Sequence, residues 1–174
     1  MALEKLEKDE LFGLLNETEM ALLSNASSVV KLEKGERACK AGHSASHFFV
    51  LLNGRVELTR PSAVGPSILV DDLLPGSVFG VSSVMDTARF YLDGDCVEDC
   101  EVLKIEGRAL RRVLEMNPTV GYFLQRRLSK IFFKRFVDAM ERVQAPARTV
   151  SVAPARSVFG FGTTGAGGST LVQH

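Results

Sequence analysis

Short apolar segments separated by tight turns limit this chain to a few folds. From Val29 to Ile105, Gly or Pro turns recur about every dozen residues, which leaves no room for helices that would connect parallel strands. Asn53-Gly54 is the clearest turn signal, because Asn-Gly favours the two-residue loop of a β-hairpin. We therefore predict a mainly β fold with flanking helices, an antiparallel jelly roll or β-roll. The expected strands are Val29–Leu32, Phe48–Leu52, Val56–Leu58, Ser67–Val70 and Val102–Ile105.

Helical patterns flank this β region on both sides. A leucine-rich stripe within Leu3–Leu14 predicts one short helix, and a capping-box pattern at Asn16 begins a second. Beyond the last strand, a short helix is expected over Arg108–Glu115. A long C-terminal helix then follows over Thr119–Val143, with a length of ~37 Å at the rise of an α-helix.

The chain divides into one domain and a tail. Residues 1–144 carry the periodic patterns, and a length of 174 residues with 45% hydrophobic and 24% charged residues is ordinary for one globular domain and an appendage. Residues 145–174 are rich in Ala, Pro and Gly and contain no acidic residue. We expect this tail to be disordered.

Charge and hydropathy exclude several classes of protein. The formal net charge is zero, so no overall field favours nucleic acid or acidic lipid. The segment Met1–Glu10 alternates charges instead of forming a signal peptide, and no apolar run approaches the ~18 residues of a membrane span. We expect a cytoplasmic protein without membrane insertion, whose Cys39, Cys96 and Cys100 are buried, reduced thiols.

The long helix has more apolar surface than a helix on a small barrel needs. We predict that residues 119–143 form a homodimer, with folding back of the tail as the alternative. Its basic side, which includes Arg127 and Lys130, is either solvated or a contact for an acidic protein partner. Val120, Leu124, Leu128, Phe132, Phe136, Met140 and Val143 line one face, and Phe123, Ile131, Phe133 and Val137 widen it.

Several other functions lack support in the sequence. No helix-turn-helix pattern is present, so direct DNA binding is not expected. Cys39, His43 and His47 are spaced by four, but Gly42 argues against the helix that would align them as metal ligands, and no further ligand can be named. No Ser/His/Asp or Cys/His set can be assembled, so we do not expect an enzyme.

A Gly-x-x-Phe-Gly turn is the most informative motif for function. The stretch Gly76–Ser83 opens onto small polar residues and can present backbone N–H groups to an anion. Nineteen residues beyond Gly80, the segment Asp99–Ile105 reads as a turn that leads into a buried strand. These two segments are the ends of a candidate phosphate-binding cassette.

Four motifs in order resemble the cyclic-nucleotide-binding domain of the catabolite activator protein family. They are Lys34-Gly-Glu36 with Ala41-Gly42, Phe48–Glu57, Pro75–Gly80 and Asp99–Leu103, within a match from Leu11 to Val143. The resemblance implies a non-enzymatic sensor module that binds cyclic AMP or cyclic GMP in the cassette and signals through the C-terminal helix. In that family, a Glu after Phe-Gly bonds the ribose 2′-hydroxyl, and an Arg pairs with the cyclic phosphate.

This chain departs from the family pattern at the charged contacts. Val81 occupies the position of the Glu, and Phe90 that of the Arg. Arg89 stands one residue early, so it needs a local bulge to reach the phosphate, and Asp93 replaces a Thr or Ser. Two hypotheses follow. In the first, the cassette binds a small molecule, which is cyclic AMP, cyclic GMP or a divergent, more apolar effector. In the second, the cassette is ligand-free and the domain acts in protein–protein interaction and dimerisation. The candidate ligand-binding residues are Phe79, Gly80, Val81, Ser82, Ser83, Arg89, Phe90 and Tyr91.

Overall fold

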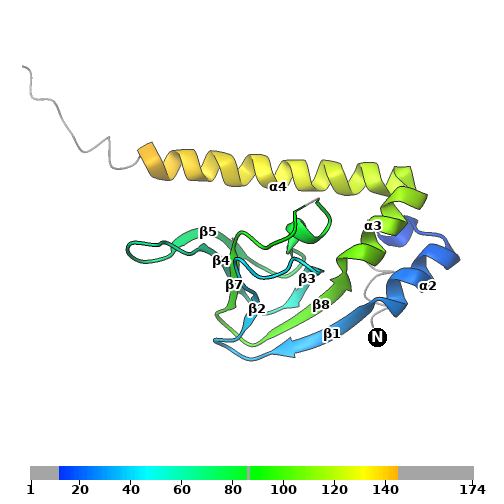
Figure 1. The fold of residues 1–174 in the computed structure, drawn as a ribbon, viewed down its shortest axis with the longest axis horizontal. Coiled ribbons are helices and arrows are strands. Elements are labelled where there is room, and N and C mark those ends of the chain that lie inside the picture. Colours follow the sequence, from blue (N-terminus) through cyan, green and yellow to red (C-terminus); the bar gives the residue numbers. More distant parts are fainter. Residues whose placement is uncertain (1–11, 86, 145–174) are drawn as a thin grey trace, which may run out of the picture.

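The computed structural model describes residues 12–85 and 87–144 (Figure 1). The helix predicted within Leu3–Leu14 lies outside the described residues except for Phe12–Leu14, which form a 3₁₀ helix, and the tail from residue 145 lies outside them as well. The strands are β1 (Ser27–Leu32), β2 (Arg37–Cys39), β3 (His47–Asn53), β4 (Val56–Arg60), β5 (Ile68–Leu73), β6 (Val78–Phe79), β7 (Asp93–Cys96) and β8 (Cys100–Glu106). The helices are the short 3₁₀ helices η1 (Phe12–Leu14) and η2 (Val81–Ser83), and α2 (Glu17–Asn25), α3 (Gly107–Met116) and α4 (Pro118–Gln144).

The strands form two four-stranded antiparallel sheets, which confirms the predicted β-roll. Their strand orders are β1-β8-β3-β6 and β2-β7-β4-β5. The turn predicted at Asn53-Gly54 joins β3 to β4, and Gly54 has a φ of 87° that favours glycine. Figure 1 shows α2 and α3 at one end of the roll, with α4 running from there along one side of it toward β5.

The sheet β1-β8-β3-β6 is covered on both faces. In β3, Phe48 and Val50 pack toward the helices, whereas Phe49 and Leu51 point into the space between the two sheets. Alternate residues of a strand face opposite sides of its sheet, so this run of four buried residues serves two cores. The continuous apolar pattern of the sequence reflects that double burial.

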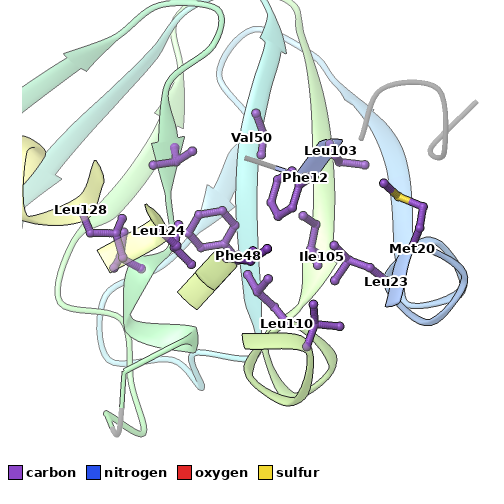
Figure 2. Packing of buried hydrophobic residues seen from close by; sticks show 14 residues of the cluster. Phe12, Met20, Leu23, Phe48, Val50, Leu103, Ile105, Leu110, Leu124 and Leu128 are labelled. Atoms are coloured by element: carbon purple, nitrogen blue, oxygen red, sulfur yellow. The ribbon is translucent and has the colours of Figure 1, made fainter. Parts of the chain in front are cut away.

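The two cores are separate clusters of buried residues. We call the first the helix-side core, in which α2, α3 and the first half of α4 meet the sheet (Figure 2); its members are Phe12, Met20, Leu23, Phe48, Val50, Val78, Val81, Leu103, Ile105, Leu110, Val113, Val120, Leu124 and Leu128. We call the second the roll interior; its members are Cys39, Phe49, Leu51, Val56, Leu58, Leu73, Phe79, Phe90, Cys96, Cys100 and Val102. The three cysteines are free and buried, as predicted.

The predicted capping box at Asn16 is present and has a second role. Asn16 Oδ1 accepts from the Glu19 amide at 2.9 Å, and Glu19 Oε2 accepts from the Asn16 amide at 3.1 Å. Glu19 is buried, and its Oε2 also accepts from Asn117 Nδ2 at 3.0 Å. Because Asn117 lies between α3 and α4, this network joins the start of α2 to the junction of the two C-terminal helices.

The buried face of α4 is shorter than the sequence pattern suggests. Val120, Leu124 and Leu128 are buried, whereas Phe132, Phe136 and Met140 on the same predicted stripe are exposed. The helix therefore extends beyond the core that covers its first half.

Candidate functional site

The cassette begins where β6 ends. Gly80 has a φ of 68°, and a Cβ there would lie 2.6 Å from Phe49 Cδ2 and 2.7 Å from the His47 carbonyl oxygen. A side chain is thus excluded both by backbone conformation and by space. Phe79 stacks on Phe49 with ring centroids 4.8 Å apart, which fixes the turn to the roll interior.

Val81, at the position of the family's Glu, lies in the helix-side core. Its side chain is 7% exposed and packs in the cluster shared by α2, α3 and α4. A carboxylate at this place would lose its hydration among apolar side chains. The chain therefore uses this position for packing.

Phe90, at the position of the family's Arg, fills part of the roll interior. It is 9% exposed, and its ring centroid lies 6.3 Å from that of Phe49. Two backbone hydrogen bonds hold it in place: its amide donates to the His43 carbonyl at 3.0 Å, and its carbonyl accepts from the Gly42 amide at 2.8 Å. An aromatic side chain thus occupies the space between the sheets.

Arg89 and Tyr91, on either side of Phe90, are both exposed. Arg89 pairs with Ser44 in an isolated β-bridge, and its Nη1 donates to the Gly42 carbonyl at 2.7 Å. This contact holds the guanidinium on the loop between β2 and β3. Of the candidate residues, the structure brings Phe79 and Phe90 together in the roll interior and places Val81 in the other core.

Asp93 is buried and its carboxylate is engaged within the protein. Its Oδ1 accepts from the Ala41 amide at 2.7 Å, and its Oδ2 lies 2.9 Å from Arg37 Nη1. This position, a Thr or Ser in the family pattern, therefore forms a structural link between β7 and the segment around β2. The ion pair supplies charge-assisted hydrogen bonds that compensate for burial of the carboxylate.

The family model for the cyclic nucleotide-binding domain matches residues 29–117, more than half of the chain. The chain belongs to the cyclic nucleotide-binding domain family. The match extends from β1 to the residue after α3 and so includes the whole cassette. It confirms the resemblance on which the positions of Val81 and Phe90 were assigned.

One relative of this domain is a cGMP-dependent protein kinase of Eimeria tenella. The two sequences are 26% identical over 155 residues, which is 87% of this chain and 15% of the kinase. This chain thus spans only a small part of the length of its curated relative.

Solved structures with the same fold come from bacteria and a protozoan. The sensor domain of the transcriptional regulator DNR from Pseudomonas aeruginosa gives a TM-score of 0.66 at 23% identity, over 76% of this chain and 89% of that one. The Thermus thermophilus catabolite activator protein gives 0.60 at 21% identity, over 80% and 63%. The regulatory subunit of a cAMP-independent protein kinase A from Trypanosoma brucei gives 0.57 at 15% identity, over 83% and 46%. These likenesses show the fold.

A second feature, which sequence reasoning missed, is an open cleft of about 610 Å³ beside the cassette. We call it the polar cleft. It lies between the loop before β3, the cassette and the start of α3. Ser83 belongs to the predicted cassette, and no motif in the sequence marks the other lining residues. Its lining residues are Ser44, Ala45, Ser46, His47, Ser83, Thr87, Ala88, Glu106, Arg108 and Arg111.

His47 connects β3 to the polar cleft. Its Nδ1 lies 2.8 Å from Ser46 Oγ. Burial lowers the pKa of the imidazole below 6.5, and Lys104 lowers it further, while Glu106 acts in the opposite direction. The ring is therefore predominantly neutral at neutral pH.

The described residues give no sign of a metal centre or a membrane span. Within residues 12–85 and 87–144, no group of three or more His, Cys, Asp or Glu side chains could hold a metal ion. Cys39 ends β2 and His47 begins β3, so their spacing does not lie on a helix. No helix in the same part of the chain is long and apolar enough to cross a bilayer.

Proposed function

We propose that this domain is a regulatory interaction module in which the family's nucleotide pocket is filled by the chain's own side chains. In this proposal it acts through α4, as a dimerisation and protein-interaction domain, and does not bind cyclic AMP or cyclic GMP in the cassette. The observation that carries the proposal is the separation of Val81 and Phe90. These two positions should face one ligand, yet they lie in two different apolar cores.

The free energies of the missing hydrogen bonds support weak nucleotide binding. A hydrogen bond to a charged group contributes roughly 1.5 to 3 kcal/mol. Without two such bonds, a ligand bound with micromolar affinity, about 8.2 kcal/mol, becomes millimolar or weaker. Arg89 does not offset this loss in the structure, because its guanidinium bonds the Gly42 carbonyl.

The distal half of α4 supports a role in dimerisation. Phe133, Phe136 and Met140 are exposed and follow one another at spacings of three and four residues, the seam of a helix pair. Val120 and Leu124 of the same helix face the helix-side core, so the seam lies on the side turned away from the roll. A second copy of α4 is the occupant that this pattern fits.

Cyclic-nucleotide binding is the second candidate function, favoured by the 26% identity to a cGMP-dependent kinase. The fold also occurs in the regulatory subunit of a cAMP-independent kinase, so fold alone does not decide the ligand. Calorimetric titration of the full chain with cyclic AMP and cyclic GMP distinguishes the two candidates. We expect no saturable heat up to millimolar nucleotide.

A double variant sharpens that test. Val81→Glu with Phe90→Arg restores the family's two charged residues, and we expect it still not to bind cyclic AMP or cyclic GMP, because the two positions lie in different cores and do not face one ligand. Arg89→Ala in the otherwise natural chain is the control. We expect its titration with either nucleotide to show no saturable heat, as for the natural chain. Micromolar binding of either nucleotide by the natural chain would overturn the proposal, and its loss in Arg89→Ala would establish the second candidate.

A further inference from the structure

We infer that the polar cleft is a binding site for a phosphate group carried on a small molecule. The cleft lies outside the roll interior, where the family pattern places a cyclic nucleotide. It is formed by the cassette, the start of α3 and the loop before β3. This site does not depend on whether the cassette binds a nucleotide.

The first observation is a buried hydroxyl without a partner. Ser83 lines the cleft and is only 2% exposed, and its Oγ forms no hydrogen bond within the part of the chain that the structure describes. Leaving a buried polar group unpaired costs about 1–3 kcal/mol. Native proteins contain few such groups, and each one calls for an explanation such as a bound water or ion. A phosphate oxygen would accept the proton of this hydroxyl.

The second observation concerns the first turn of α3. The first amides of an α-helix have no acceptor within the helix, and the N-cap residue Glu106 provides no side-chain cap. The Gly107 amide donates to the Ser46 carbonyl at 2.9 Å. The amide of Arg108, the second residue of α3, has no acceptor inside the helix, and Arg108 lines the polar cleft. The partial positive charge at this end of the ten-residue helix favours an anion.

The third observation is the charge of the lining. Arg108 is exposed and Arg111 is half-buried, and guanidinium groups bind phosphate through paired N–H donors. Glu106 is the opposing carboxylate, and it is exposed. Two arginines face one carboxylate, so the charges of the lining sum to a net positive value even with His47 neutral.

The size of the cleft favours a phosphorylated molecule over a bare ion. Its volume of about 610 Å³ lies within the range of small-molecule sites, ~300–1,000 Å³. Serine hydroxyls at Ser44 and Ser46, together with the small side chains of Ala45 and Ala88, line the remainder. A ligand here would contact both the cassette and α3, the helix that leads into α4.

The test is a titration of the full chain with inorganic phosphate at constant ionic strength, followed by amide chemical shifts. We expect saturable shifts at Ser83 and Arg108. Arg108→Ala should weaken binding about tenfold or more, the value of one charged hydrogen bond. Arg112→Ala is the matched control, because Arg112 lies on α3 but does not line the polar cleft, and we expect it to leave affinity unchanged.

Ser83→Ala separates binding from packing. It removes the unpaired hydroxyl, so the melting temperature without phosphate should stay the same or rise, while phosphate affinity falls about tenfold. Shifts that do not saturate, or equal weakening by Arg108→Ala and Arg112→Ala, would overturn the proposal, since both indicate attraction to the surface in general. A titration with cyclic AMP tests the proposed function separately. Saturable shifts at Phe79 and Phe90, in the roll interior, would contradict the proposed function and leave the phosphate site standing.

Discussion

Arg135 Nε donates to Asp71 Oδ2 at 2.7 Å, and this contact holds the second half of α4 against β5. Both side chains are partly buried, with 13% and 24% of their surface exposed. Nearby, Arg127 Nη2 donates to the Gly76 carbonyl at 3.0 Å, so α4 also contacts the turn that leads into β6. The Arg135 contact lies beyond Leu128, the last buried residue of α4 in the helix-side core, whereas Arg127 lies just before it.

Removing the Arg135–Asp71 pair should loosen the distal part of α4. We expect Arg135→Ala to increase amide hydrogen exchange over residues 130–144, because few apolar contacts replace the lost ion pair. Global stability should fall by about 1 kcal/mol or less, as for a partly exposed pair. Arg126→Ala, an exposed arginine of the same helix, is the control. Equal exchange in both variants would show that the pair does not hold α4.

Phe90 should behave as a core residue. Phe90→Ala removes a ring from the roll interior, and we expect a loss of about 3 kcal/mol in the free energy of unfolding. Tyr91→Ala, next to it and exposed, should change stability by less than about 0.5 kcal/mol. Urea unfolding measures both variants. If Phe90→Ala were as mild as Tyr91→Ala, the roll would tolerate an empty space at the position of the family's Arg.

Gly107 is required by the contact between α3 and the cassette. A Cβ at this position would lie 2.5 Å from the Ser83 carbonyl oxygen and 2.8 Å from Ser83 Cβ. Alanine is the better helix former by about 1 kcal/mol, but the backbone clash opposes that gain. We expect Gly107→Ala to destabilise by about 1–3 kcal/mol. A Cβ at Gly121 would lie 3.1 Å from the Leu114 carbonyl oxygen, so we expect Gly121→Ala to destabilise less. Thermal unfolding measures both variants. A lower melting temperature for Gly121→Ala than for Gly107→Ala would contradict this account.

The Cys39 thiol makes stability depend on alkaline pH. Burial raises its pKa from 9.0 to about 12, and Asp93 adds to the shift. Between these values the unfolded chain loses the proton and the folded chain keeps it, so stability is full below about pH 9 and falls as the pH rises. At about pH 10 we expect a loss of about 1 kcal/mol from this group. Cys39→Ala should show a shallower decline in urea unfolding, and an identical decline would rule out this origin.

The order of strands and helices follows from the sequence because local signals agree with it. The Asn16 capping box, the Asn53-Gly54 turn and the proline that begins α4 each act within a few residues. Local signals in the sequence do not show that the buried residues form two separate cores. The apolar run Phe48–Leu51 does not reveal that its alternate residues enter different clusters, because that depends on which elements cover each face.

The site illustrates the same limit. Counting along the chain placed Val81 and Phe90 at the family's charged positions, but sequence alone did not show that each belongs to a different core. Ser83 and Arg108 are 25 residues apart in the sequence, so only tertiary contact brings them to one cleft. Neither belongs to a local pattern that would have linked them.

The exposed seam of α4 should control the oligomeric state. Phe136→Asp places a charge between Phe133 and Met140, and burial of that charge in a helix pair is costly. We expect the natural chain to sediment as a dimer, and this variant as a monomer with nearly unchanged helicity. Lys130→Asp alters charge outside the Phe133–Met140 seam and should remain dimeric. A natural chain that sediments as a monomer at micromolar concentration would contradict dimerisation through α4 and leave interaction with a different protein as the role of this face.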